Sequence, residues 1–199
     1  YPQSTRLGRL GMDYALFDSV VDGRPFVQGD TDAFFEMLTV VSHAKNVEND
    51  FDPTMDTDVI PIIDPAEKWF DTNRGEMVTI EGTARRVTRI EIDDPDRQKQ
   101  VGAKHYWEIY VFVPTNLIRV NNRLQDDYPI VCCVRTIPAS MPTGDRITEN
   151  IRLSGFAFKR YAYSLPRVHV ASPQGDGNEG GARRETPLII ATRVNATAR

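Results

Sequence analysis

The sequence predicts an α+β protein that is mainly β: a five-stranded Greek-key barrel over about residues 76–194, with a helical extension over residues 1–75. The first observation is a change of period at Glu76, where helical spacing of apolar residues gives way to alternation. The second is that two long strand-like stretches, "VTIEGTARRV" and "IRLSGFAFKRYAY", each contain an internal glycine, Gly82 and Gly155. Because glycine permits a sharp bend, such strands can curve between two sheets of a small barrel.

The strongest helix signal in the extension is "DTDAFFEMLTVVSHAK", residues 30–45. Asp30, Thr31 or Asp32 can cap this helix, and acidic residues in the first turn suit the helix dipole. Its apolar side chains fall on one broad face, formed by Phe34, Phe35, Met37, Leu38 and Val41. We therefore expect the helix to pack on a core.

An acidic stretch with two prolines, residues 46–64, follows this helix and indicates a loop. Its carboxylates are oxygen ligands of the kind that calcium takes, but the spacing lacks the glycine and terminal glutamate of an EF-hand. A solvated acidic loop is the preferred interpretation. Asp64, Pro65 and Glu67 then form a start signal for a short helix that ends near Gly75.

Five strands are expected after this helix. They begin with about 15 residues from Glu76 and continue at 105–114, 128–137, 147–164 and 186–194. The connections are a polar hairpin loop, a turn, a proline-rich segment too short for a helix, and a flexible glycine-rich loop, at residues 93–104, 121–127, 138–145 and 172–185. We expect fast amide exchange in the glycine-rich loop.

Alternation along the strands also predicts the barrel core. Side chains of one parity should share the interior: Val78, Ile80, Ile109, Val111, Ile151, Leu153 and Ile190. Cys132 and Cys133 are neighbours on a strand, so their side chains point to opposite faces and cannot pair as a disulfide without a strained turn. We expect both to be small apolar groups in or near the core.

Three stretches resemble known proteins with OB or OB-like domains. "RGEMVTIEGTARRV", Arg74 to Val87, resembles the opening strand of extracytoplasmic OB domains of the tRNA-anticodon-like type, with Trp69 and Phe70 before it. "GFAFKRYAY" and "TPLIIATRV" are similar to a family of uncharacterised planctomycetal proteins. The resemblance covers residues 65–194 and implies an OB-like barrel next to a membrane-associated segment. It supplies no catalytic residue, and the helix that usually separates the third and fourth OB strands is expected to be missing.

Charge is distributed unevenly along the chain. The net charge is −4, but residues 1–75 hold 6 basic and 14 acidic residues, whereas residues 76–199 hold 18 and 14. We expect part of this asymmetry to be satisfied within the chain, with the acidic loop 48–58 near Arg85, Arg86 or Lys159. His43, His105 and His169 lie far apart, and neither a nucleophile elbow nor a phosphate-binding loop is found.

These observations predict a non-enzymatic binding or scaffolding module, part of a longer membrane-associated or exported protein, with no cofactor and no bound metal. An extracytoplasmic or membrane-associated location and a protein or oligosaccharide partner are expected. The candidate ligand-binding residues combine aromatic and basic side chains: Arg85, Arg86, Tyr106, Tyr110, Lys159, Arg160 and Tyr161. The alternative is a single-stranded nucleic-acid-binding OB domain. It is less favoured because Glu108 lies amid the proposed aromatic platform and would repel phosphate.

Overall fold

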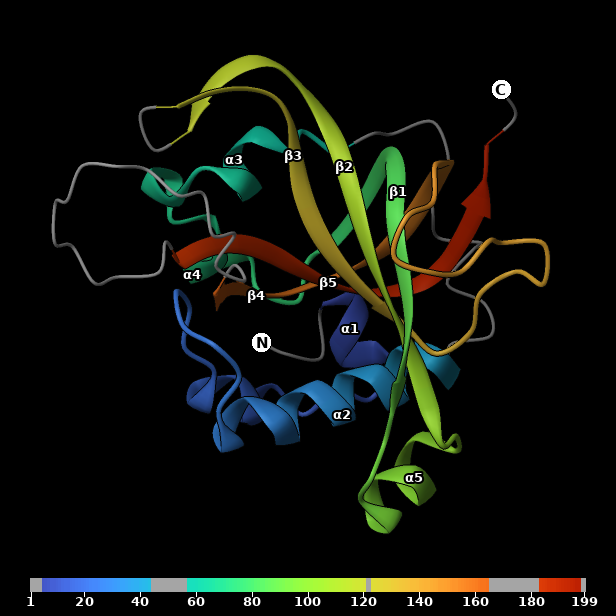
Figure 1. Cartoon of the computed structure of the whole chain (residues 1–199). Helices are drawn as coiled ribbons and strands as arrows, with labels where there is room; N and C mark the ends of the chain where they lie inside the picture. Colours follow the sequence, from blue (N-terminus) through green and yellow to red (C-terminus); the bar gives the residue numbers. More distant parts are fainter. Residues whose placement is uncertain (1–4, 44–56, 121–122, 165–182, 198–199) are drawn as a thin grey trace, which may run out of the picture.

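A computed structural model of the chain describes residues 5–43, 57–120, 123–164 and 183–197. Five strands close into a barrel in the order β1-β2-β3-β5-β4 (Figure 1). The strands are β1 (Met77–Glu91), β2 (His105–Val120), β3 (Arg123–Val134), β4 (Glu149–Ser164) and β5 (Arg183–Ala196). Only β3 and β5 pair in parallel. The protein is therefore a mainly β, OB-like Greek-key barrel, as the sequence predicts.

The hairpin of β2 and β3 is longer than predicted. The expected turn 121–127 is largely part of β3, because the two strands still pair at Ile118 with Gln125 and at Val120 with Arg123. Backbone pairing requires no apolar side chains, so a polar sequence can continue a ladder. The glycine-rich loop 172–185 falls outside the described residues up to position 182, and β5 begins at Arg183.

The two glycine-bearing stretches are direct partners in the barrel. Val78 pairs with Gly155, and Gly82 pairs with Ile151. A Cβ on Gly82 would lie 2.5 Å from the carbonyl oxygen of Phe112, and a Cβ on Gly155 would lie 2.5 Å from that of Ile190. Both positions thus require glycine because another strand approaches too closely for any side chain. The local resemblance of the two stretches reflects this shared role.

The barrel interior contains six of the seven predicted core residues, all buried in one cluster: Val78, Ile80, Ile109, Val111, Ile151 and Leu153. Ile190 is the exception. It is fully buried, but it belongs to a second cluster outside the barrel, while Ile189 and Ala191 face the interior. The prediction assigned β5 the wrong parity, and a shift of one residue exchanges the two faces. Cys132 and Cys133 are buried on opposite faces, as predicted.

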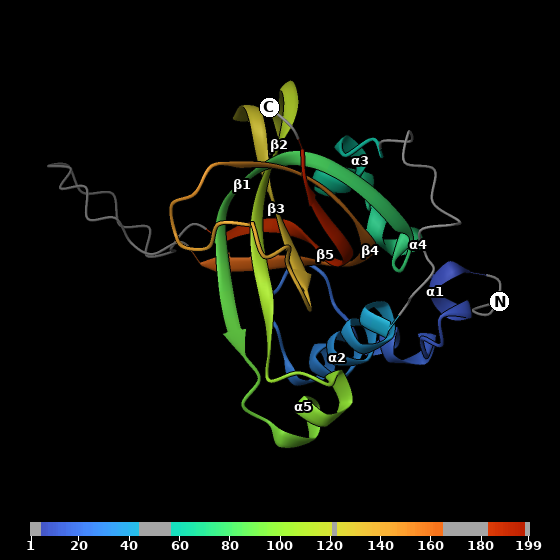
Figure 2. The same cartoon turned by 90° about the vertical axis from the view of Figure 1, so that its right-hand side faces the viewer.

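The second cluster joins the barrel to helix α2 (Gln28–His43), which lies beneath the strands in Figures 1 and 2. This helix confirms the one predicted at 30–45 and starts two residues earlier. Its buried side chains Phe34, Met37, Leu38 and Val41 share a cluster with residues of the strands' outer faces, namely Val131, Cys133, Phe156, Phe158, Leu188 and Ile190. A large part of the outer barrel surface is therefore covered by the protein's own N-terminal segment.

Further short elements precede the barrel. Helix α1 (Arg6–Arg9) and the 3-10 turn η2 (Tyr14–Ser19) lead to α2, while α3 (Ile60–Ile63), η4 (Pro65–Glu67) and α4 (Trp69–Asn73) lead to β1. Asp64 caps η4 as predicted, and its carboxylate accepts the N–H of Ala66. Ile62, Ile63 and Phe70 enter the interior cluster. Residues 135–148, between β3 and β4, contain no helix, as expected.

The connection 93–104 differs from the predicted polar loop, because it contains helix α5 (Pro95–Val101). Asp94 accepts the N–H of Asp96 as N-cap, and Gly102 ends the helix with φ 69°. These start and stop signals are present in the sequence. Gln100 on α5 donates to Glu36 on α2 at 3.0 Å, and Arg97 pairs with Asp32. None of the helices in the described ranges is long and apolar enough to cross a membrane.

Candidate functional site

The outer face of β2 carries the aromatic residues that the sequence singled out. Trp107, Ile109, Val111 and Val113 pack with the interior cluster. The alternate residues Tyr106 and Tyr110 pack instead with the second cluster, which lies outside the barrel against α2 and is called the outer cluster below. This confirms the prediction of which residues of the strand face inward and which face outward. We call the outward residues Tyr106, Glu108, Tyr110 and Phe112 the β2 face.

A cavity of about 210 Å³ lies where α2 meets the β2 face. We call this cavity the aromatic pocket, and its lining residues are Phe26, Thr31, Phe34, Phe35, Tyr106, Glu108, Val131, Cys133, Tyr161 and Leu188. The ring of Phe34 lies with its centroid 5.3 Å from those of both Phe26 and Tyr106, and Phe26 lies 5.7 Å from Tyr161. The walls are therefore aromatic rings set at steep angles to one another.

Among the lining residues that the structure describes, Glu108 contributes the one carboxylate. Burial raises the pKa of this carboxyl above its usual value, and the nearby Arg86 opposes the shift. Within the described ranges, the carboxylate of Glu108 has no hydrogen-bond or ion-pair partner. Burial also raises the pKa of Tyr106, so its phenol stays neutral at physiological pH. The pocket thus combines aromatic walls with one partly desolvated acceptor.

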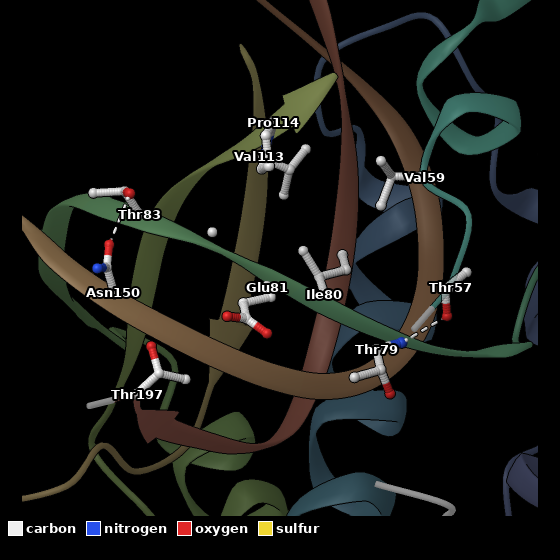
Figure 3. Close-up of a pocket in the computed structure, with 11 residues that line it drawn as sticks. Thr57, Val59, Thr79, Ile80, Glu81, Thr83, Val113, Pro114, Asn150 and Thr197 are labelled. Carbon is white, nitrogen blue, oxygen red and sulfur yellow. Dashed lines mark hydrogen bonds between the residues drawn. The ribbon is translucent and has the colours of Figure 1, made fainter. Parts of the chain in front are cut away.

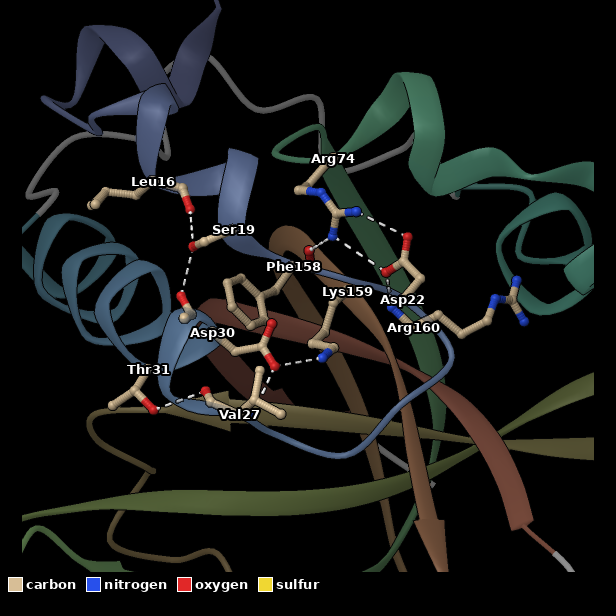
Figure 4. Close-up of polar contacts among 11 residues, drawn as sticks. Leu16, Ser19, Asp22, Val27, Asp30, Thr31, Arg74, Phe158, Lys159 and Arg160 are labelled. Atoms are coloured by element: carbon tan, nitrogen blue, oxygen red, sulfur yellow. Dashed lines mark hydrogen bonds and ion pairs between the residues drawn. The ribbon is translucent and has the colours of Figure 1, made fainter.

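The N-terminal segment is fixed beside the pocket by a buried ion pair (Figure 4). The ammonium of Lys159 on β4 donates to Asp30 on α2 at 2.8 Å, and both side chains are 0 % exposed. The same carboxylate oxygen of Asp30 accepts the N–H of Val27 at 2.9 Å. Asp30 is therefore not the N-cap that the sequence suggested, but the acidic residue that reaches back to the start of the helix.

Arg160 is also engaged inside the protein. Its guanidinium donates to the carbonyl oxygens of Ile62 and Ile63 at 3.0 and 2.9 Å, and the residue is 6 % exposed. Its backbone N–H donates to Asp22, which pairs with Arg74 at 2.9 Å (Figure 4). Lys159 and Arg160 therefore do not lie on an open surface as the ligand hypothesis assumed. Residues of the N-terminal extension supply most of their polar partners, and Glu185 on β5 lies 3.8 Å from the guanidinium of Arg160.

Arg85 and Arg86 lie on the surface next to Phe112 and Tyr110 of the β2 face. A register shift between Ala84 and Arg86 interrupts the alternation of β1 at this point. The guanidinium of Arg85 lies 4.5 Å from the ring centroid of Phe112, and that of Arg86 lies 5.3 Å from that of Tyr110.

Each of these two arginines also has an acidic partner. Arg85 pairs with Asp127 at 3.1 Å, and Arg86 pairs with Asp145 at 3.2 Å. The acidic loop 48–58 was expected near these residues, but only its last two residues lie in the described ranges. The partners of Arg85 and Arg86 come instead from β3 and from the segment between β3 and β4.

The structure thus brings two of the seven predicted ligand residues, Tyr106 and Tyr161, into the aromatic pocket. Arg86 on β1 pairs in register with Tyr110 on β2, and Arg85 lies over the ring of Phe112. Sequence reasoning missed Phe26, Phe34 and Phe35 as members of the same site. Phe34 and Phe35 were recognised only as an apolar helix face, and nothing local to Phe26 reveals its place. Glu108 was placed correctly on the outward parity, but only as a residue that opposes phosphate.

A second cavity, of about 520 Å³, is lined by residues of β1, β2 and β4 (Figure 3). Its lining residues are mostly small and polar: Thr57, Val59, Thr79, Ile80, Glu81, Gly82, Thr83, Val113, Pro114, Asn150 and Thr197. We call it the threonine cavity. Thr57 accepts the N–H of Thr79 at 2.8 Å, and Thr83 donates to Asn150 at 3.1 Å. The carboxylate of Glu81 in this lining pairs with Arg152. None of the predicted ligand residues lines it.

No group of three or more metal-ligating side chains occurs in the described ranges. No family model matches the chain, and no curated protein does either. Among solved structures, the mitochondrial single-stranded DNA binding protein Rim1 from S. cerevisiae is similar. The identity is 9 %, the TM-score is 0.29, and the match covers 61 % of this chain and 94 % of that one. A likeness of this size indicates nothing about ligands.

Proposed function

We propose that this protein is a non-enzymatic binding module that engages a polypeptide partner through the β2 face and the aromatic pocket. The observation that carries the proposal is the pocket itself. Several aromatic rings and a carboxylate without a partner in the described ranges meet there, between α2 and the barrel. Aromatic side chains dominate the energetics of protein interfaces because they bury a large area at a low entropic cost.

The surroundings of the pocket support this role. Arg85 and Arg86 are about half exposed, with side chains 55 % and 43 % accessible. Each stacks on an aromatic residue of the β2 face. Interfaces typically have such an arrangement, with aromatic anchors at the centre and arginines at a polar rim.

The alternative function, binding of single-stranded nucleic acid, is favoured by the same stacked pairs of Arg85 with Phe112 and Arg86 with Tyr110. The charge around them opposes it. Asp127 and Asp145 offset the two arginines, and Glu108 lies further along the face. Phosphate binding depends on uncompensated lysine and arginine side chains, and Lys159 and Arg160 are enclosed in the protein. We therefore prefer a polypeptide partner.

The proposal can be tested by panning a random linear peptide library against the full chain. We expect enriched peptides whose binding is lost in Tyr106→Ala and retained in Thr83→Ala, a control in the threonine cavity. Far-UV circular dichroism of both variants checks that the fold is kept. Failure to enrich any peptide, or equal binding to both variants, would overturn the proposal.

The nucleic-acid alternative has its own test. Fluorescence anisotropy with labelled single-stranded oligonucleotides should show no saturable binding at low salt. Tight binding that weakens steeply as salt rises, and that is lost in Arg85→Ala, would favour the alternative instead.

A further inference from the structure

We propose that the aromatic pocket binds a methylated ammonium group, either as a small quaternary ammonium compound or as a methylated lysine side chain. This inference rests on the proposed function, because it names the chemistry that the same pocket recognises. Phe26, Phe34 and Tyr106 form the walls, and Glu108 supplies the negative charge.

The first argument is the arrangement of the rings. Phe34 lies nearly perpendicular to Phe26, with an interplanar angle of 89°, and at 61° to Tyr106. Phe35 packs at 82° to Phe34 with a centroid distance of 5.2 Å. All four rings line the same small cavity, and an aromatic ring attracts a cation that lies within about 6 Å of its centroid.

The second argument is charge complementarity. The carboxyl of Glu108 is partly withdrawn from water, which raises its pKa. It has no ion-pair partner in the described ranges. A cation in the pocket would supply the missing charge. Arg86 acts on Glu108 from β1, but its guanidinium is paired with Asp145. Lys159 lies 5.4 Å from the centroid of Phe26, and its charge is paired with Asp30.

The third argument is the chemistry of the lining. A primary ammonium has three N–H donors and a guanidinium has five, and each donor buried without an acceptor is costly. The aromatic walls provide few acceptors, and the hydroxyl of Thr31 already donates to Val27. A fully methylated ammonium has no donors, so aromatic faces and one carboxylate satisfy it.

The size of the cavity indicates that it holds the charged head group of a ligand and not the whole ligand. Its volume of about 210 Å³ is below the range of roughly 300–1,000 Å³ in which drug-sized ligands bind. The rest of the ligand must therefore lie outside. Phe26 is 38 % exposed, so one wall of the pocket borders on solvent. A methylated lysine on a peptide chain and a choline-like compound both have this shape.

The test is a titration of the full chain, followed by nuclear magnetic resonance at constant ionic strength. The probes are tetramethylammonium, choline, its neutral isostere 3,3-dimethylbutanol, and a short peptide carrying either trimethyl-lysine or lysine. We expect saturable shifts of Tyr106 and Phe35 with the methylated cations. The neutral isostere and the unmodified peptide should bind at least tenfold more weakly.

Glu108→Gln removes the charge and keeps the shape, and it should weaken binding of the cation at least tenfold. Glu81→Gln, which makes the same change in the threonine cavity, should leave it unaltered. Absence of saturable binding, equal binding of the neutral isostere, or no effect of Glu108→Gln would overturn the inference. If peptides selected on the β2 face still bind without any preference for a methylated cation, the inference fails while the proposed function stands. Tighter binding of the peptide than of choline would identify a protein as the source of the group.

Discussion

Replacement of Lys159 by methionine should strongly destabilise the protein. Lys159 and Asp30 are both 0 % exposed and lie 2.8 Å apart, and the pair connects β4 to α2. The side chain of methionine fills similar space, so the main effect is to leave the carboxylate of Asp30 buried without its cation. Removal of one partner of a buried pair costs about 3–5 kcal/mol. We expect Lys159→Met to lower the free energy of unfolding by this amount.

The ion pair of Lys159 and Asp30 itself stabilises the fold by less than the loss expected in Lys159→Met. Burial lowers the pKa of Lys159 even though Asp30 favours the charged form. Moving both charges out of water offsets much of their attraction, so the large penalty arises from leaving one charge isolated. Asp30→Asn can still accept the N–H of Val27 through its amide oxygen. The double variant should therefore cost at least about 2 kcal/mol less than the sum of the two single variants.

Urea unfolding, followed by the fluorescence of Trp69 and Trp107 and by far-UV circular dichroism, measures these changes. Lys99→Met is the matched control, because Lys99 and Asp96 form a pair with side chains 79 % and 90 % exposed. The control should change stability by no more than about 0.5 kcal/mol. A loss below about 1 kcal/mol in Lys159→Met, or additive effects in the double variant, would refute the reasoning.

Three further results are expected. Gly82→Ala and Gly155→Ala should each lower the free energy of unfolding by about 1–3 kcal/mol or more, because the new Cβ meets a backbone oxygen; unchanged urea midpoints would contradict this. Burial raises the pKa of Cys132 and of Cys133. As the pH rises, these thiols therefore lose their protons in the unfolded chain before they do so in the folded protein. Stability should fall above about pH 8.5, by up to ~1.4 kcal/mol per pH unit for each thiol. Urea titrations at several pH values should show a shallower fall in Cys132→Ala. Removal of residues 1–43 should expose the outer cluster and increase the fluorescence of bound anilinonaphthalene sulfonate, and a truncated chain that is soluble and binds no dye would contradict the packing described.

The sequence was sufficient for the barrel because its signals are local. Alternation reveals which side of a strand faces inward, and Gly82 and Gly155 mark the bends. The same reasoning failed for Ile190, since parity on β5 depends on where the strand joins β3 and β4. Helix α5 could have been predicted, because Asp94, Pro95 and Gly102 supply its start and stop signals.

The proposed binding surface was harder to predict from the sequence, because it is formed by segments far apart in the chain. Lys159 and Arg160 lie between aromatic residues of one strand and resemble a basic groove in the sequence. The side-chain partners are Asp30 for Lys159, 129 residues away, and the carbonyl oxygens of Ile62 and Ile63 for Arg160, 98 and 97 residues away. Composition alone cannot show whether a basic side chain faces solvent or an internal acceptor. Phe26 reaches the pocket for the same reason, through the folding of the N-terminal segment onto β4.

The central claim, that the β2 face and the aromatic pocket bind the partner, is tested most directly by mapping amide chemical shifts while a selected peptide is added to the full chain. We predict that the perturbed residues gather along β2 from Tyr106 to Phe112 and on α2 around Phe34 and Phe35. Shifts confined to the threonine cavity, around Glu81 and Asn150, would contradict the claim.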